Sequence, residues 1–124
     1  MTKLAYVFTE PQKLWIEALK SGEYQQTQNV LHDCQGFCCL GVACAVYEKA
    51  TRHPLEKREG YIYGHDLDQQ FAVKEWLGLY SARGMPKNTH LGWLTQLNDV
   101  QNYSFNQIAE HLEKYPEYYF NQGE

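Results

Sequence analysis

The sequence lacks long apolar runs and any excess of positive charge. No stretch approaches the roughly 18 apolar residues that a membrane-spanning helix needs, and residues 1–13 have neither the apolar core nor the cleavage site of a secretory signal. We therefore expect a cytoplasmic protein with no membrane partner. Lys and Arg total 11 against 15 Asp and Glu, which gives a net charge of −4. This balance disfavours binding to duplex nucleic acid, because such binding needs many uncompensated cations.

Motifs for metal ions and for phosphate loops are also missing. The 5 histidines are scattered without an H-x3-H pair, and neither GxxxxGK[ST] nor GxGxxG occurs. The spacing of the cysteines differs from the paired CxxC knuckles of structural zinc sites, and no secretion signal favours disulfides. We predict no cofactor and no metal, and we expect reduced, buried thiols at Cys34, Cys38, Cys39 and Cys44.

The composition is otherwise that of a globular protein with many aromatic residues. Hydrophobic residues make up 44% of the 124 residues and charged residues 21%, and the chain has 10 Tyr, 5 Phe and 3 Trp. No repeat, linker or low-complexity tract divides the chain. We expect a single compact domain over residues 1–124.

Capping patterns and apolar spacing predict the helices. Thr9 and Gln12 form a capping box that starts a helix over 11–21, and Ser104 and Gln107 start another that ends before Tyr115. Apolar spacing predicts three more helices. These are a buried helix over 40–50, a helix capped by Asp66 and Gln69 and ended by Gly78, and a short helix over 91–97 stopped by Asn98-Asp99.

Apolar runs on both sides of Asp33-Cys34-Gln35-Gly36 predict a β-hairpin with a loop of three or four residues. Residues 61–63 are predicted to form a short strand, and residues 4–8 either a strand or a tail packed on the core. Together these elements predict the α+β class, with four or five short helices packed on a small antiparallel sheet of hairpin type.

The remaining segments are predicted to be loops or tails. The charged interval 51–60 is expected to be an exposed loop. Residues 80–90 have no periodicity and are a candidate binding edge. The aromatic tail 117–124 is expected to pack on the body or on a second copy of the chain.

The run from Asp33 to Phe37 resembles the nucleophile segment of NlpC/P60-type cysteine peptidases. In that family a helix N-terminus lowers the pKa of the thiol and a distant His serves as the base, a place that His65 or His90 would take here. The predicted hairpin places Cys34 in a turn, so the following helix would act on Cys39, and the apolar neighbours of Cys39 favour burial. We expect no catalytic residue, and a thiol-dependent hydrolase is the alternative.

Aromatic and polar residues beside predicted loops favour a binding site. Flat rings stack on a nucleobase, and Arg or Lys hold phosphate. We expect Tyr24 or Tyr63 to stack on a base, with Gln26 nearby. Arg83 and Lys87 are expected to hold phosphate. The ribose or base edge is assigned to Asn98 and Asp99. The alternative is that the tyrosines only cover the edge of the core.

Six motifs follow one another over residues 13–113. They are a Trp-containing first helix, SGEYxQ from Ser21, FCCLGVxC from Phe37, VxxWLGL from Val73, LND from Leu97 and SFxxIA from Ser104. This pattern resembles a family of small accessory proteins encoded by tailed phages. The resemblance implies an accessory protein that acts in the cytoplasm of an infected bacterium, where such proteins commonly bind and neutralise host factors.

We therefore expect an anti-defence protein that sequesters a host nucleotide-derived signalling molecule without turnover. The partner is then a small nucleotide-like ligand. Because the helices are short and the tail is aromatic, a homodimer whose second copy completes the pocket is left open. An inhibitor that binds a host enzyme is the other alternative.

Overall fold

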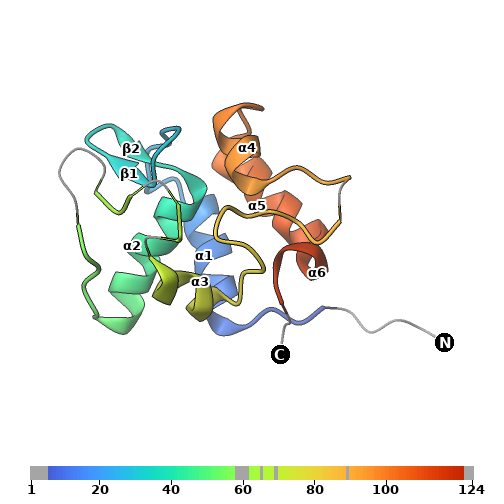
Figure 1. Cartoon of the computed structure of the whole chain (residues 1–124), viewed down its shortest axis with the longest axis horizontal. Helices are drawn as coiled ribbons and strands as arrows, with labels where there is room; N and C mark the ends of the chain where they lie inside the picture. The colour runs from blue at the N-terminus through green and yellow to red at the C-terminus, as the bar shows by residue number, and fades with distance from the viewer. Residues whose placement is uncertain (1–5, 58–61, 65, 69, 89, 122–124) are drawn as a thin grey trace.

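The computed structural model describes residues 6–57, 62–64, 66–68, 70–88 and 90–121. Within these residues six helices and one hairpin form the fold (Figure 1). In chain order they are α1 (Glu10–Lys20), β1 (His32–Asp33), β2 (Gly36–Phe37), α2 (Cys39–Thr51), α3 (Phe71–Leu77), α4 (Leu94–Asp99), α5 (Phe105–Lys114) and α6 (Pro116–Tyr119). This arrangement confirms the α+β class, with one helix more than expected.

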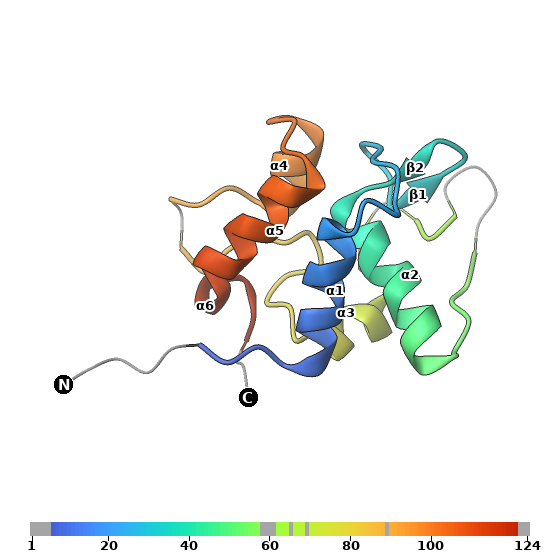
Figure 2. The same cartoon turned by 180° about the vertical axis from the view of Figure 1, so that it is seen from behind.

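Helix α1 is the centre of the packing and lies between α2 and α5 (Figure 2). Its Trp15 is fully buried, and the indole Nε1 donates a hydrogen bond of 2.9 Å to the carbonyl of Cys39 at the start of α2. The Trp15 ring also meets the ring of Phe120 edge to face, with centroids 6.2 Å apart. One side chain therefore joins α1, α2 and the last described segment.

Helix α2 is buried along its first two turns, as its apolar sequence predicts. Its residues 39–44 are all buried. A Cβ on Gly41 would lie 1.6 Å from the carbonyl oxygen of Leu31. Only glycine allows this approach between the helix and the segment that leads into the hairpin.

Both predicted capping boxes are confirmed. The hydroxyl of Thr9 accepts from the backbone N–H of Gln12 while the Gln12 side chain accepts from the N–H of Thr9, and Ser104 and Gln107 make the same pair. Reciprocal caps satisfy two backbone donors that a helix start leaves unpaired. The observed bounds of α1 lie one residue before the predicted ones.

Two helix starts differ from the prediction. The side chain of Asp66 accepts from the N–H of Asp68 in a turn, and α3 begins later, after Gln70. The predicted partner in that cap, Gln69, lies outside the described residues. Helix α4 begins at Leu94 and includes both residues that were expected to stop it, Asn98 and Asp99. The αL conformation of Gly78 ends α3 as predicted.

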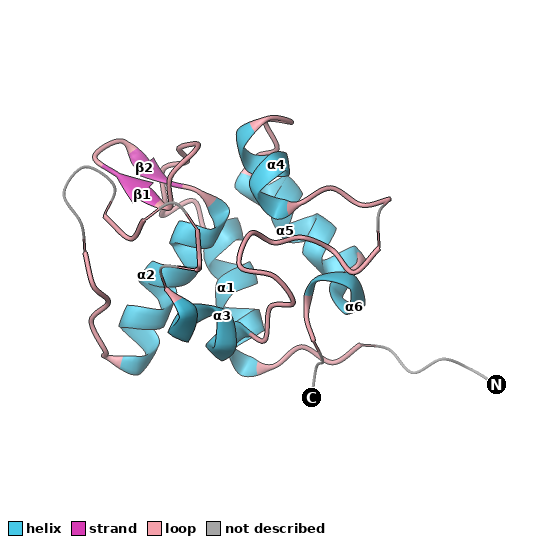
Figure 3. Ribbon diagram, viewed as in Figure 1, coloured by secondary structure: helices cyan, strands magenta, loops and turns pink. Residues whose placement is uncertain are grey.

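The hairpin is confirmed, but its loop has two residues rather than three or four (Figure 3). The carboxylate of Asp33 accepts from the N–H groups of Gln35 (2.9 Å) and Gly36 (3.0 Å), which fixes the turn. The predicted strand 61–63 is a turn at its two described residues. Ile62 in that turn donates its N–H to the carbonyl of His32. Tyr61 lies outside the described residues.

The C-terminal segment packs on the body, as expected for residues 117–121. The N–H of Tyr80 donates to the carbonyl of Tyr119 (2.8 Å), and the N–H of Asn121 donates to that of Gly78 (2.7 Å). Phe120 is fully buried, and Tyr6 and Phe8 of the N-terminal segment pack against its ring. Residues 6–8 form no strand.

The two predicted loops are irregular where the structure describes them, which is at 52–57 in the first and at 80–88 and 90 in the second. The helices that the described residues form are all too short or too polar to cross a membrane.

Candidate functional site

Two grooves of about 510 Å³ each open on the surface. The first, here the α1–α2 groove, is lined by Leu14, Glu17, Ala18, Ser21, Glu23, Tyr24, Val46, Lys49 and Ala50. The second, here the His111 pocket, is lined by His90, Leu91, Gly92, Leu97, Tyr103, Gln107, Glu110, His111, Lys114 and Tyr115.

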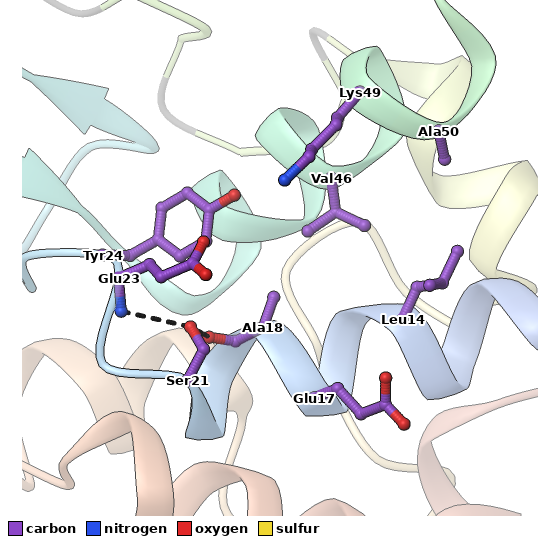
Figure 4. Close-up of a pocket in the computed structure, with 9 residues that line it drawn as sticks. All are labelled: Leu14, Glu17, Ala18, Ser21, Glu23, Tyr24, Val46, Lys49 and Ala50. Atoms are coloured by element: carbon purple, nitrogen blue, oxygen red, sulfur yellow. Dashed lines mark hydrogen bonds between the residues drawn. The ribbon is translucent and has the colours of Figure 1, made fainter.

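The α1–α2 groove has an apolar floor and a charged rim (Figure 4). Lys49 and Glu23 both reach toward the end of the groove where Tyr24 lies. The Tyr24 ring packs edge-on against Phe37, with centroids 5.2 Å apart. Within the described residues, Glu17, Glu23 and Lys49 form no ion pair. The rim therefore carries one more negative charge than positive.

The His111 pocket lies between α5 and the segment that leads into α4. The apolar face of α5 is buried in the core, so its polar residues face the opening. On the opposite wall, the side chain of Asn88 accepts from the N–H groups of His90 (3.0 Å) and Leu91 (3.1 Å). These bonds hold the backbone of that wall in place.

Three tyrosine rings lie close to the imidazole of His111. Its centroid lies 6.4 Å from that of Tyr103, 5.2 Å from that of Tyr115 and 5.3 Å from that of Tyr119. Tyr103 and Tyr115 are half-buried and line the opening. The pocket thus offers planar side chains held by the fold, which suits a planar ligand.

The hydrogen bonds of His111 orient its ring. Nε2 lies 2.6 Å from the hydroxyl oxygen of Tyr119, and that hydroxyl donates to the carbonyl of Gly92, also over 2.6 Å. Burial, followed by the charge of Lys114, lowers the pKa of His111 below its ordinary value of 6.5. The imidazole is therefore neutral near pH 7. Burial also raises the pKa of Tyr119, which keeps its hydroxyl protonated.

The pocket also has a cation available for a ligand. The ammonium of Lys114 lies 5.4 Å from the centroid of the Tyr115 ring. Neither Lys114 nor Glu110 forms an ion pair within the described residues, whereas the neighbouring Glu113 pairs with Lys20 at 2.7 Å. Stacking on tyrosine together with an unpaired ammonium suits a planar anion.

A family model matches residues 9–116, and its description is a domain of unknown function, DUF8296. The chain belongs to this family. No curated protein and no solved structure matches it. The matched range includes every residue that lines the α1–α2 groove and the His111 pocket. Both openings are therefore built from the family's own domain.

The seven residues predicted from the sequence do not come together in one opening. Tyr24 lines the α1–α2 groove, and none of the seven lines the His111 pocket. The hydroxyl of Tyr63 donates to Glu48, and its side chain is 4% exposed, so its ring is not available for stacking.

The two predicted phosphate ligands lie on the surface with other partners. The guanidinium of Arg83 pairs with Asp66 at 3.0 Å. The ammonium of Lys87 donates to the carbonyl of Asn121 over 3.3 Å and lies above the ring of Tyr80.

Asn98 is a buried structural residue and not a surface contact for a ligand. Its Oδ1 accepts from the side chain of Gln26 (2.8 Å) and from the N–H of Cys39 (3.2 Å). Its Nδ2 donates to the carbonyl of Thr27 and to the carboxylate of Asp99, both over 2.8 Å. Gln26, Asn98 and Asp99, three of the predicted site residues, are therefore hydrogen-bonded to one another. They join α4 to α2 and to the segment before the hairpin.

Burial of the thiols is confirmed for Cys38, Cys39 and Cys44. Burial raises the pKa of Cys38 to about 12 and that of the other two well above 9.0. The prediction is wrong for Cys34, which is exposed in the hairpin turn.

The peptidase-like arrangement finds no support among the described residues. None of them gives the Cys34 thiol a hydrogen bond or a charged partner. Of the candidate bases, His90 lines the His111 pocket and His65 lies outside the described residues. Nor do the described residues hold a group of three His, Cys, Asp or Glu side chains able to bind a metal ion.

Sequence reasoning missed His111, Lys114, Tyr103 and Tyr115. The histidines were considered only as metal ligands, which require several imidazoles together, and, for His65 and His90, as the base of a thiol enzyme. One signal was present, because Gln107 and His111 are four residues apart and therefore share one side of α5, which Tyr115 follows directly as the C-cap.

Proposed function

We propose that this chain binds a small, phosphorylated ligand with a nucleobase in the His111 pocket and holds it without turnover. The observation that carries the proposal is the joint lining of one opening by Tyr103, Tyr115 and an unpaired Lys114. A ring stacks on either tyrosine, and a phosphate group meets the ammonium.

The size and charge of the pocket limit the ligand. Its volume of about 510 Å³ falls among those of small-molecule sites. Lys114 is balanced by Glu110, so the ligand carries few phosphates rather than a long polyphosphate chain. The exposed His90 on the opposite wall supplies a second donor for phosphate oxygens.

The resemblance to tailed-phage accessory proteins gives this binding a role. A protein that captures a host nucleotide-derived signal inside an infected bacterium lowers the free concentration of that signal and so blunts the defence that it triggers. No catalytic step is needed, since each copy removes one ligand.

A capture experiment tests the proposal. The purified protein is mixed with cyclic dinucleotides or ADP-ribose derivatives, separated from free ligand and denatured, and the released material is analysed by mass spectrometry. Recovery of unchanged ligand supports sequestration, whereas altered ligand indicates an enzyme. Capture of none of these compounds contradicts the proposal. The ratio of ligand to chain separates a pocket complete in one copy from one that a homodimer shares.

The two grooves supply matched variants. Lys114→Ala and Tyr115→Ala each remove one contact from the His111 pocket and should weaken binding about tenfold, because a hydrogen bond to a charged group or a stacked ring contributes roughly 1.4 kcal/mol or more. Lys49→Ala and Tyr24→Ala make the same changes in the α1–α2 groove and should leave the affinity unchanged. Equal losses in both pairs would place the ligand elsewhere.

Inhibition of a host enzyme is the second candidate function, and the α1–α2 groove favours it. Its apolar floor fits apolar side chains of a partner helix, and Glu17 and Glu23 attract a basic residue beside them. Ala18→Arg fills this groove. Inhibition of a host enzyme that is lost in Ala18→Arg but kept in Lys114→Ala would favour this candidate over sequestration.

A further inference from the structure

The polar contacts of His111 fix which of its ring nitrogens carries the proton. The carbonyl of Gly92 can only accept a hydrogen bond, so the hydroxyl of Tyr119 must donate its one proton to this carbonyl. Toward His111 the same hydroxyl can then only accept. Nε2 of His111, 2.6 Å away, is therefore the nitrogen that donates.

This assignment leaves Nδ1 of the neutral imidazole as an acceptor. Within the described residues Nδ1 forms no hydrogen bond, and no side-chain nitrogen or oxygen there is both buried and without a partner. Nδ1 is therefore open to solvent, on a side chain that lines the pocket. The other tautomer would lose the bond to Tyr119.

We propose that Nδ1 of His111 accepts a hydrogen bond from an amino group of the bound nucleobase and so selects amino-bearing bases, an inference that rests on the proposed function. The ring centroids of Tyr103 and Tyr115 lie 6.4 Å and 5.2 Å from that of the same imidazole. A base stacked on either ring brings its edge close to His111. A base edge with only acceptors faces the lone pair of Nδ1 and gains nothing from it.

The tautomer is tested first, without any ligand. Long-range proton–nitrogen NMR of the free protein should show a pyrrole-type Nε2 and a pyridine-type Nδ1 for His111. In Tyr119→Phe, which keeps the ring but removes the hydroxyl, the two nitrogens should show an averaged state. A protonated Nδ1 in the unmodified neutral protein overturns the inference.

Selectivity is tested with nucleotide pairs that differ by one amino group. AMP is compared with purine riboside monophosphate, and GMP with IMP. In at least one pair the amino-bearing member should bind at least about tenfold more tightly, because the other member lacks the amino group that donates to Nδ1.

Two substitutions of His111 separate its two nitrogens. His111→Asn keeps an acceptor near the place of Nδ1 and should retain part of the preference. His111→Gln keeps a polar group near the place of Nε2 but offers no acceptor near that of Nδ1. This variant should therefore bind the two members of each nucleotide pair with about equal affinity. A preference that survives in His111→Gln overturns the inference.

The outcomes distinguish this inference from the proposed function. Binding of these nucleotides without any amino-group preference overturns only the role of Nδ1. Failure of every nucleotide to bind, in the capture experiment and here, overturns both.

Discussion

Asn98 in α4 and His111 in α5 are polar side chains on helices that pack against each other, and they use their hydrogen bonds in opposite ways. Both polar atoms of the Asn98 amide are bonded to protein groups, four bonds in all. His111, which lines the pocket, has one nitrogen bonded and one without a partner among the described residues.

The difference is the one expected between a polar group that serves the fold and a polar group that is free to contact a ligand. A buried group must have all its hydrogen bonds made inside the protein, since each one left unmade is costly. A ligand-binding group must be held in place by some bonds and keep another free. Asn98 meets the first condition and His111 the second.

The largest expected effect tests the structural role of Asn98. Asn98→Ala removes all four bonds and leaves the buried N–H of Cys39 and the carbonyl of Thr27 without these partners. The free energy of unfolding should fall by about 3 kcal/mol. Urea unfolding measures it. Asn106→Ala, at an exposed position on α5, is the matched control and should change stability by less than about 0.5 kcal/mol. Similar values for the two variants would contradict the structural role of Asn98.

Sequence reasoning could not separate these two residues. Three of the four partners of Asn98 lie 59, 71 and 72 positions away in the chain, so the sequence showed only a polar residue near the end of a helix, which is typical of a surface position. Tyr63 was misplaced for the same reason, because its partner Glu48 lies in α2. Burial of a polar group depends on distant partners that local spacing does not reveal.

The second prediction concerns His111 and the pH dependence of the free energy of unfolding. Burial lowers the pKa of His111 in the folded protein, so the unfolded chain takes up this proton first as the pH falls below 6.5. The stability that neutral His111 contributes is complete above pH 6.5 and is lost as the pH falls through the lower, folded pKa. Urea unfolding between about pH 8 and about pH 5 should show this loss.

His111→Gln is the control for the pH prediction, because Gln does not titrate. Other groups near the ring, namely Glu110, Lys114 and the three tyrosines, remain in this variant and set its background. The pKa of Glu48 responds to burial, which raises it, and to bonds from Lys57 and Tyr63, which together bring it below 4.5. The protonation of Glu48 therefore affects stability only at a pH below the range of this experiment. Identical pH profiles for the two proteins would show that His111 is not the group responsible.

Where structure is decided locally, the sequence predicted it well. The capping boxes at Thr9 and Ser104 require contacts over three residues only; α5 starts directly after its predicted cap, and α1 starts one residue before its predicted bound. The hairpin follows from Asp33, whose carboxylate bonds within its own turn. Helix α3 starts later than predicted because Asp66 accepts a hydrogen bond within a turn instead of capping the helix. The local sequence is compatible with both arrangements and does not show which one forms.

The smallest expected effect concerns the thiols. Cys34→Ser should change the free energy of unfolding by no more than about 0.5 kcal/mol, since the side chain is exposed in a turn. A thiol reagent should label this cysteine quickly in the native protein and the other three only after unfolding, as mass spectrometry of peptides would show. Fast labelling of Cys39 would contradict its burial. Loss of ligand capture in Cys34→Ser would revive the thiol-enzyme alternative.

The burial of Phe120 against Trp15 has a consequence for how the protein is made. The ribosome releases α1 and α2 long before Phe120, so the aromatic surface around Trp15 stays uncovered during most of translation. Tyr119, which orients His111, arrives in the same step as Phe120. The orientation of the His111 ring is therefore completed only when the interior closes around Phe120.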